Sequence, residues 1–172
     1  MIDEIRWTIE PFNSAMHKRD DFACGYAELD TYIRQYASQD AKKRIAQIFV
    51  ALFDDDLTIK GYYTVSAASF RKEDLPTELA KRLPHYPVPA AILGRLAVDQ
   101  TAQGQRLGEY LLMNAFDRII QASRSIAIHA IIADAKDERV KAFYERYGFR
   151  AFKAQPLRMF ISMATVEQLR SH

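Results

Sequence analysis

Apolar and polar positions follow two different periods along the chain, and the period separates candidate strands from candidate helices. Apolar, β-branched and aromatic runs predict strands at residues 5–12, 47–53, 59–68, 91–98, 126–133 and 159–163. Apolar positions three or four apart predict helices at residues 28–45, 76–83, 105–122 and 138–147. Strands alternate with helices in the second half, which indicates an α/β (α+β) fold whose mixed central sheet has helices on both faces.

The same periods indicate which side chains face the core. The inward positions expected in the three longer helices are Leu29, Ile33, Tyr36 and Ala37, then Leu107, Leu111, Ala115 and Ile119, then Val140, Phe143 and Tyr147. The run at 126–133 is continuously apolar, which predicts a strand buried on both faces with His129 as a core residue. His17 and His172 are expected at the surface, and His85 is a candidate to line a substrate entrance.

Length and composition fit a single domain spanning residues 1–172. The one cysteine, Cys24, excludes an intrachain disulfide and a multi-cysteine metal site, and we expect it to be a small packing group. No apolar run approaches the length of a membrane span, and the first residues lack the apolar segment of a signal peptide. We therefore expect a cytoplasmic protein without a membrane or metal requirement.

Basic residues are clustered although the net charge is only +2. The clusters are Lys42, Lys43 and Arg44, then Arg71 and Lys72, then Lys81 and Arg82. Clustering of this kind can create a positive face for a polyanion on a nearly neutral protein. Solvated surface charges without a partner explain the pattern equally well.

Residues 94–108 carry the clearest chemical signal. A predicted strand ends near Val98, a polar loop with Gly104 follows, and the long helix is expected to begin near Gln105. Amides at a helix start have no intrahelical acceptor, so this arrangement suits a pyrophosphate. Neither a Walker A loop nor a dinucleotide fingerprint is present, and a turn followed by a helix with one small packing residue is the simpler alternative.

Several motifs together resemble a known family. They are Phe-Ala-Cys-Gly at 22–25 with Leu29, Asp30, Tyr32, Ile33, Asp40 and Arg44; Gly-Tyr-Tyr-Thr-Val-Ser-Ala at 61–67; Leu-Pro-His-Tyr-Pro-Val-Pro at 83–89; Leu-Gly-Arg-Leu-Ala-Val-Asp at 93–99; residues 103–108; and Ala-Phe-Tyr-Glu-Arg-Tyr-Gly-Phe at 142–149. This set resembles the GNAT N-acetyltransferases, and within them the toxin branch of type II toxin–antitoxin pairs. The resemblance implies the GNAT fold with a splayed acetyl-CoA cleft.

The resemblance also implies how acetyl-CoA, the co-substrate, is held. The implied cofactor-binding residues are Leu96, Ala97 and Val98 for the pantetheine arm, Gln103, Gly104, Gln105, Arg106, Leu107 and Gly108 for the pyrophosphate, and Phe143. An N–H from Val98 can stabilise the oxyanion. The sequence departs from the family pattern at Arg106, where glycine or alanine is usual, and at Thr101, where glutamine or arginine is usual.

Tyr144 is the candidate catalytic residue. The resemblance implies that this tyrosine donates a proton to the leaving thiolate of coenzyme A. From the residues alone, Tyr144 reads as one aromatic of a packed helix face. A neutral α-amine with a pKa near about 7.7–8 needs no strong base to attack a thioester.

The acceptor amine follows only from the resemblance, which implies the α-amine of aminoacyl-tRNA, acetylation of which arrests translation. The residues expected to contact tRNA are Arg95, Lys42, Lys43, Arg44, Arg71, Lys72, Lys81 and Arg82. A ribbon-helix-helix antitoxin and a homodimer are implied partners. Two alternatives remain open: an acetyltransferase for a small amine or protein N-terminus without an antitoxin, and a non-catalytic binding module on a GNAT scaffold.

Overall fold

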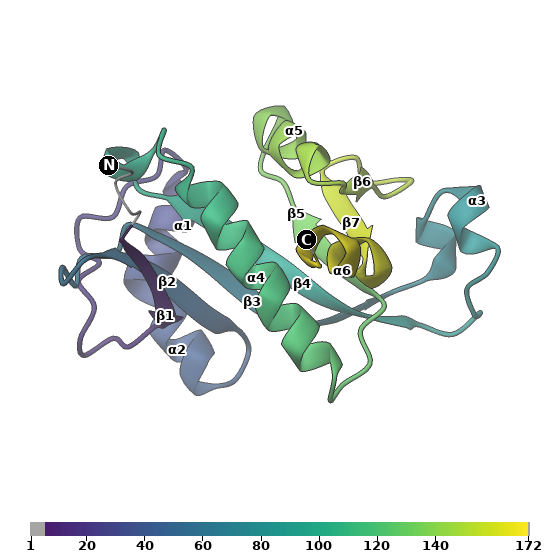
Figure 1. Cartoon of the computed structure of the whole chain (residues 1–172), viewed down its shortest axis with the longest axis horizontal. Helices are drawn as coiled ribbons and strands as arrows, with labels where there is room; N and C mark the ends of the chain where they lie inside the picture. Colours follow the sequence, from purple (N-terminus) through teal and green to yellow (C-terminus); the bar gives the residue numbers. More distant parts are fainter. Residues whose placement is uncertain (1–5, 172) are drawn as a thin grey trace. The chain divides into compact units, whose positions relative to one another are not determined.

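The computed structural model describes residues 6–171. Within these residues, seven strands form one mixed sheet in the order β1-β2-β3-β4-β5-β7-β6 (Figure 1). Their bounds are Trp7–Pro11, Gln47–Phe53, Gly61–Phe70, Val88–Val98, Ala130–Asp134, Arg150–Ala151 and Arg158–Ser162 for β1 to β7. The pair β4–β5 is parallel, whereas β1–β2, β2–β3, β5–β7 and β6–β7 are antiparallel. The predicted mixed sheet is confirmed.

The helices follow the predicted order, with additional short turns. Their bounds are Ala27–Thr31 for α1, Ala37–Lys42 for α2, Thr77–Ala80 for α3, Leu107–Ser123 for α4, Glu138–Arg146 for α5 and Met163–Arg170 for α6. A π turn, η1, occupies Tyr32–Tyr36, and 3-10 turns occupy Lys72–Asp74 (η2) and Gln100–Ala102 (η3). The helix α6 and the short strand β6 were not predicted from the sequence.

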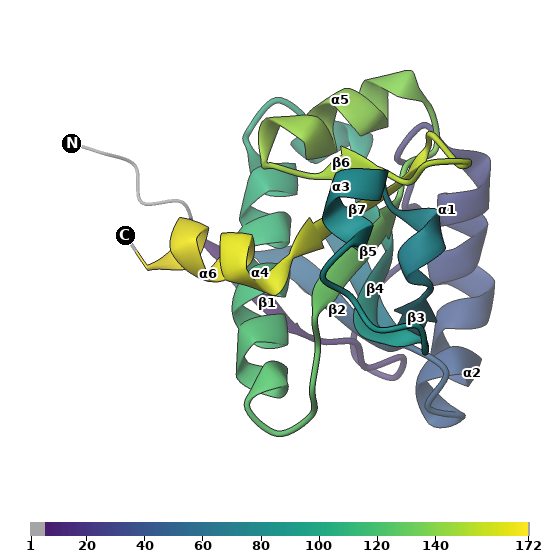
Figure 2. The same cartoon turned by 90° about the vertical axis from the view of Figure 1, so that its right-hand side faces the viewer.

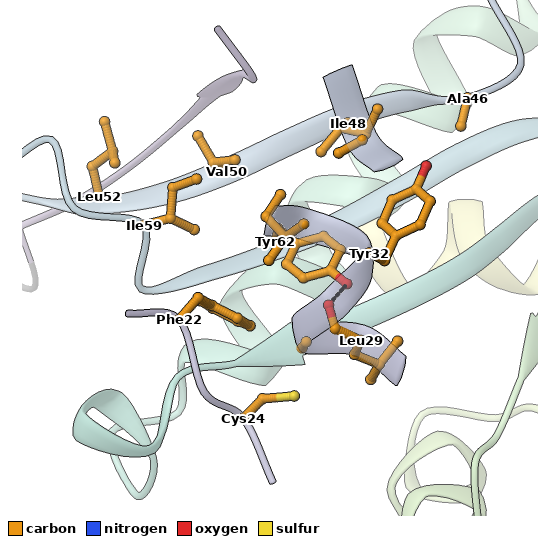
Figure 3. Packing of buried hydrophobic residues seen from close by; sticks show 13 residues of the cluster. Phe22, Cys24, Leu29, Tyr32, Ala46, Ile48, Val50, Leu52, Ile59 and Tyr62 are labelled. Atoms are coloured by element: carbon orange, nitrogen blue, oxygen red, sulfur yellow. Dashed lines mark hydrogen bonds between the residues drawn. The ribbon is translucent and has the colours of Figure 1, made fainter. Parts of the chain in front are cut away.

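The described chain divides into two compact units. The first holds the described residues up to Val65 together with Arg95–Ala115, and the second holds Ser66–Gly94 and the described residues from Phe116 onward. In the first unit, strands β1 and β2 lie between the helical segment α1–α2 and the first half of α4 (Figure 2). On the α1–α2 side, Tyr62 donates its hydroxyl to the Leu29 carbonyl at 2.7 Å within a buried apolar cluster (Figure 3).

On the other face of the first unit, Gly61 allows α4 to pack closely on β3. A Cβ at this position would lie 2.9 Å from the side chain of Leu111 and 3.2 Å from that of Leu107. Tyr63 donates its hydroxyl to Asn114 of α4 at 2.6 Å. The start of α4 is therefore fixed against the sheet by contacts that leave no room for a larger residue at Gly61.

The second unit has its own core. Phe70, Val88, Ile132 and Phe160 of the sheet pack with Leu75 in one buried cluster. A second aromatic group joins Phe116 of α4, Phe149 and Tyr144, with ring centroids 6.0 Å apart for the first pair and 5.0 Å for the second. This second group buries Tyr144 within its own unit.

Two predictions about buried and exposed positions in the first unit were wrong. The helix predicted at 28–45 ends at Lys42 and contains the π turn, whose extra residue rotates Tyr36 outward, so that Tyr36 is 54% exposed. His17 is 5% exposed rather than at the surface, because its Nε2 lies 3.0 Å from Glu10 Oε1 and its Nδ1 accepts the Asn13 N–H. His172 lies outside the described residues.

The strand predicted at 126–133 begins only at Ala130. Ile126 is 71% exposed and His129 is exposed, so His129 is not a core residue. The His129 backbone is still paired on both sides, because its N–H donates to the Pro89 carbonyl at 2.9 Å and its carbonyl accepts the Met163 N–H at 2.9 Å. No strand forms before His129, since β7 gives way to α6 after Ser162 and Pro89 has no N–H to donate.

Helix α5 shows a smaller departure from the predicted pattern. Val140, Phe143 and Tyr147 were expected to face inward, yet they are only half-buried, and Tyr144 is the buried residue of this helix. The Tyr144 ring contacts the rings of Phe143 and Phe149 in the second unit. The apolar spacing placed the buried face one residue away from its actual position.

Candidate active site

The segment that joins β4 to α4 is called here the cofactor loop, residues 99–106. The Asp99 side chain accepts the Thr101 N–H and so begins the turn η3. Gly104 and Arg106 then adopt left-handed backbone, with φ of +83° and +61°. These two positions reverse the chain, and α4 begins at Leu107, two residues later than the sequence predicted. Gly104 adopts its conformation without the steric cost that other residues incur.

The backbone N–H groups of residues 104–109 donate to no acceptor within the described range 6–171. At the start of a helix, such amides carry a partial positive charge and point along the axis. A Cβ built on Gly104 would meet no atom within 4 Å, so the space in front of this glycine is open. The row of amides and the open space fit the pyrophosphate of acetyl-CoA.

Asp99 organises the cofactor loop from inside. One carboxylate oxygen accepts the Ala23 N–H at 3.0 Å, and the other accepts the Thr101 N–H at 3.0 Å and its hydroxyl at 2.5 Å. Burial acts to raise the pKa of Asp99, but the hydrogen bonds from Thr101 and Ala23 together outweigh it, so that its pKa is lowered. Lys60 donates to the same Thr101 hydroxyl at 3.0 Å. The carboxylate is therefore ionised and fully used within the protein.

The side chain of Gln103 is also used within the protein. Its Nε2 donates to the carbonyls of Cys24 at 3.1 Å and Val98 at 3.0 Å. Of the predicted pyrophosphate residues, Gln103 thus offers its side chain to the protein backbone rather than to an anion. Cys24 is a buried packing residue, as predicted, and burial raises the pKa of its thiol to about 12.

The other predicted cofactor residues lie where the sequence placed them. Leu96, Ala97 and Val98 form the end of β4, whose parallel pairing with β5 stops at Leu93 opposite Ala133. The remaining loop and helix-start residues, Gln105, Arg106, Leu107 and Gly108, follow directly, and only Leu107 among them has a buried side chain. Arg106, where the sequence departs from the family pattern, has an exposed side chain and left-handed backbone.

Tyr144 is the other predicted reactive residue. It is 2% exposed, yet its hydroxyl has no hydrogen-bond partner among residues 6–171. Burial, and secondarily the carboxylate of Asp134, raise its pKa, so the phenol stays protonated at neutral pH. A buried phenol of this kind can donate a proton without first breaking a hydrogen bond within the described protein. Phe143, also a predicted cofactor residue, lies beside it on α5 and is half-buried.

Arg95 belongs to a small polar group that the sequence did not reveal. Its guanidinium lies 3.5 Å from the centre of the Tyr32 ring, and the Tyr32 hydroxyl donates to Asp40 Oδ2 at 2.8 Å. Burial raises the pKa of Tyr32, followed by its bond to Asp40. No described carboxylate pairs with Arg95, which leaves its N–H edges available to an anion. The π turn that presents Tyr32 has no signal in the hydrophobic pattern.

The basic clusters are exposed but belong to different units. Lys42 is the last residue of α2, and Lys43 and Arg44 follow it in the first unit. Arg71, Lys72, Lys81 and Arg82 flank η2 and α3 in the second unit, and Lys72 alone among them is half-buried. Within the described part of the chain, none of these seven side chains forms an ion pair. His85, the candidate for a substrate entrance, is exposed in the second unit.

Two features are absent from the part of the chain that the structure describes. Residues 6–171 contain no helix with the length and apolar character needed to span a bilayer. The same residues contain no cluster of three or more histidine, cysteine or acidic side chains arranged to hold a metal ion.

The fold and the cofactor loop define an acyltransferase that uses a coenzyme A thioester. The family model of the acetyltransferase (GNAT) domain matches residues 44–151. The probable toxin TacT of Sinorhizobium fredii is 31% identical over 94% of this chain and 93% of its own. The tRNA-acetylating toxin of Mycobacterium tuberculosis is 32% identical over 86% of this chain and 87% of its own.

A solved structure is also similar. AtaT in complex with acetyl-methionyl-tRNAfMet is 26% identical, covers 95% of this chain and 98% of its own, and has a TM-score of 0.87. AtaT has further been solved as AtaTR bound with acetyl-CoA and as a tyrosine-to-phenylalanine variant. The chain belongs to the GNAT acetyltransferase family, and acetyl-CoA is its acetyl donor.

Proposed function

We propose that the protein is the toxin of a type II toxin–antitoxin pair, which transfers an acetyl group from acetyl-CoA to the α-amine of aminoacyl-tRNA and so blocks translation. The observation that carries this proposal is the row of unpaired amides at residues 104–109 in a chain whose relatives include a tRNA-acetylating toxin. The amides supply the donor site, and the relatives supply the class of acceptor. The relative from Sinorhizobium fredii is also a probable toxin.

The transfer is a single displacement. The neutral α-amine attacks the thioester carbonyl, an N–C bond forms, and the C–S bond of acetyl-CoA breaks. The Val98 N–H stabilises the oxyanion that forms in between, and the Tyr144 hydroxyl gives its proton to the departing thiolate. The attacking nitrogen, positively charged in the tetrahedral intermediate, loses one proton to solvent as the amide forms, and Tyr144 recovers its proton from solvent.

Arg95 is the proposed contact for the acceptor end of tRNA. Its guanidinium is already held against the Tyr32 ring, so binding a phosphate costs little further side-chain order. Leu96, the next residue of β4, begins the proposed pantetheine-binding segment. The exposed basic clusters at 42–44, 71–72 and 81–82 then bind tRNA phosphates, which makes acceptor binding weaken as the salt concentration rises.

The partners and location follow from the same proposal. A ribbon-helix-helix antitoxin that covers the site keeps the enzyme inactive, the toxin acts as a homodimer, and charged tRNA places its action in the cytoplasm. Residues 1–172 work as one acetyltransferase domain, because β3, β4 and α4 each run from one compact unit into the other.

The test is an acetylation assay with labelled acetyl-CoA and a pool of charged tRNAs, read out as N-acetyl-aminoacyl-tRNA for each amino acid. We expect strong labelling by the wild type and a loss of about 10²–10⁴-fold in Tyr144→Phe, the range typical of a general acid. Val140→Ala on the same helix controls for lost packing and should retain most of the activity, because Val140 is half-buried and has no proposed role in the site. Acetyl-CoA binding without labelling of any charged tRNA would favour the alternative, an acetyltransferase for small amines or protein N-termini.

A further inference from the structure

A second loop is joined to the cofactor loop. This N-terminal loop, residues 22–24, lies at the Phe-Ala-Cys-Gly motif. Ala23 donates its N–H to Asp99 at 3.0 Å and accepts the Gln100 N–H on its carbonyl at 2.8 Å. The Cys24 carbonyl accepts Nε2 of Gln103 at 3.1 Å. The N-terminal loop therefore contacts the beginning and the middle of the cofactor loop, directly before the row of unpaired amides.

The N-terminal loop is itself fixed from the helical segment α1–η1. Asp30 accepts the Cys24 N–H on Oδ1 at 2.8 Å. Arg34 donates from Nε and Nη2 to the Phe22 carbonyl at 3.2 and 2.7 Å. Both polar side chains come from the helix that also presents Tyr32. The loop thus connects this helix to the cofactor loop through backbone groups alone.

Gln103 is the residue on which these contacts converge. Its Nε2 carries two hydrogens, and both are used, one on Cys24 and one on Val98, the last residue of β4. One amide therefore joins the end of the strand, the N-terminal loop and the cofactor loop. Removal of both donors would release the loop where it turns toward Gly104.

We propose that Gln103 is a positioning residue for acetyl-CoA, which acts by clamping the cofactor loop to the N-terminal loop and to the end of β4. The clamp holds the amides of residues 104–109 in place before the pyrophosphate arrives. Binding then carries a smaller cost in lost backbone freedom than it would with a loose loop. The inference rests on the proposed function only in that this loop binds acetyl-CoA.

The experiment compares Gln103→Met with Gln100→Met in the full chain. Methionine keeps the length of glutamine and removes its hydrogen-bonding groups, and Gln100 is an exposed residue of the same turn that takes no part in the clamp through its side chain. Calorimetric titration with acetyl-CoA should give a dissociation constant at least tenfold weaker for Gln103→Met and within twofold of wild type for Gln100→Met. Amide hydrogen exchange across 99–106 should accelerate in Gln103→Met alone.

Arg34→Met provides an independent variant should Gln103→Met fold poorly. Arg34 is exposed, and its guanidinium donates to the Phe22 carbonyl and lies 3.8 Å from Asp30, so its loss loosens the clamp from the far side. We expect acetyl-CoA binding about threefold weaker, with kcat at saturating acetyl-CoA within twofold of wild type. If the wild type binds acetyl-CoA and both Gln103→Met and Arg34→Met bind it with the same affinity, the proposed clamp is wrong. Failure of the wild type to bind acetyl-CoA would instead overturn the proposed function.

Discussion

The cofactor loop and helix α5 differ in whether their polar side chains form hydrogen bonds within the described protein. In the cofactor loop, Asp99, Thr101 and Gln103 all direct their side chains into the protein, and only backbone amides remain available. In α5, the Tyr144 side chain is buried as a whole, but its hydroxyl has no hydrogen-bond partner within residues 6–171. A loop whose groups are fixed in advance binds its ligand at a lower entropic cost. A hydroxyl without a partner, in contrast, can donate its proton without first breaking a hydrogen bond. Four predictions test this contrast, from the largest expected effect to the smallest.

The largest effect concerns pH and Tyr144. Because burial raises the pKa of Tyr144, the phenol remains the acid from pH 6 to 9, and only the acceptor amine titrates in this range. We expect the rate under subsaturating acceptor to rise about 50-fold from pH 6 to 8, as an amine of pKa about 7.7–8 loses its proton. A pH–rate profile measures this. An alkaline decline below pH 9 that disappears in Tyr144→Phe would contradict a raised pKa.

The second prediction breaks the internal network at Asp99. Asp99→Asn removes the charge and replaces one of the two acceptor oxygens with an NH2 donor, so the Ala23 N–H and the two Thr101 donors can no longer all be satisfied, and we expect a loss of about 2 kcal/mol in the free energy of unfolding. The folded-state pKa of Asp99 is lowered, so its contribution is present above the unfolded pKa and is lost as pH falls through the folded pKa. Denaturant melts should therefore show the difference between the two proteins shrinking as pH falls below about 4. A difference that is constant from pH 7 to 3 would count against an ionised, hydrogen-bonded Asp99.

The third prediction concerns Gly104. In Gly104→Ala, the φ of +83° becomes strained and the new Cβ enters the open space expected to hold the pyrophosphate. We expect acetyl-CoA to bind about tenfold more weakly, a change of about 1.4 kcal/mol. Calorimetric titration measures the affinity. As a control, Gln100→Ala changes an exposed residue of the same loop and should leave the affinity within twofold.

The smallest effect is expected at Arg106. Arg106→Gly relieves a left-handed backbone conformation but adds freedom to the unfolded chain, so we expect a stabilisation of only about 0.5–1 kcal/mol. Thermal and denaturant melts measure this change. Destabilisation by Arg106→Gly would show that the arginine side chain makes a contribution larger than the strain of its backbone.

Much of the fold follows from local patterns. The strand at Gln47–Phe53 and the long helix α4 were predicted within two residues, because their apolar periods are long and uninterrupted. The predicted strand start at residue 126 and the inward face of α5 were wrong, since both depend on neighbours far along the chain. Backbone pairing ends at His129, where β7 gives way to α6, and the buried face of α5 is set by Phe149, which lies beyond the helix.

The candidate site divides in the same way. The glycine at 104, the helix start and the Tyr144 motif are contiguous in sequence, so their residue types and spacing can be recognised without a structure. The clamp could not be recognised, because Gln103 meets Cys24 across 79 positions of the chain. The cation–π contact of Arg95 with Tyr32 likewise depends on the π turn.

The sequence by itself determined the family, the order of the elements and the loop proposed to bind acetyl-CoA, because each of these resides in short runs of residues with fixed spacing. Only the tertiary structure decided which polar side chains form hydrogen bonds within the described protein and which have no partner there. That division depends on pairing partners brought together from distant parts of the chain, as with Asp99 and Ala23, separated by 76 positions. A buried hydrogen-bonding group must be satisfied by whatever the fold places beside it, and local sequence does not specify that neighbour.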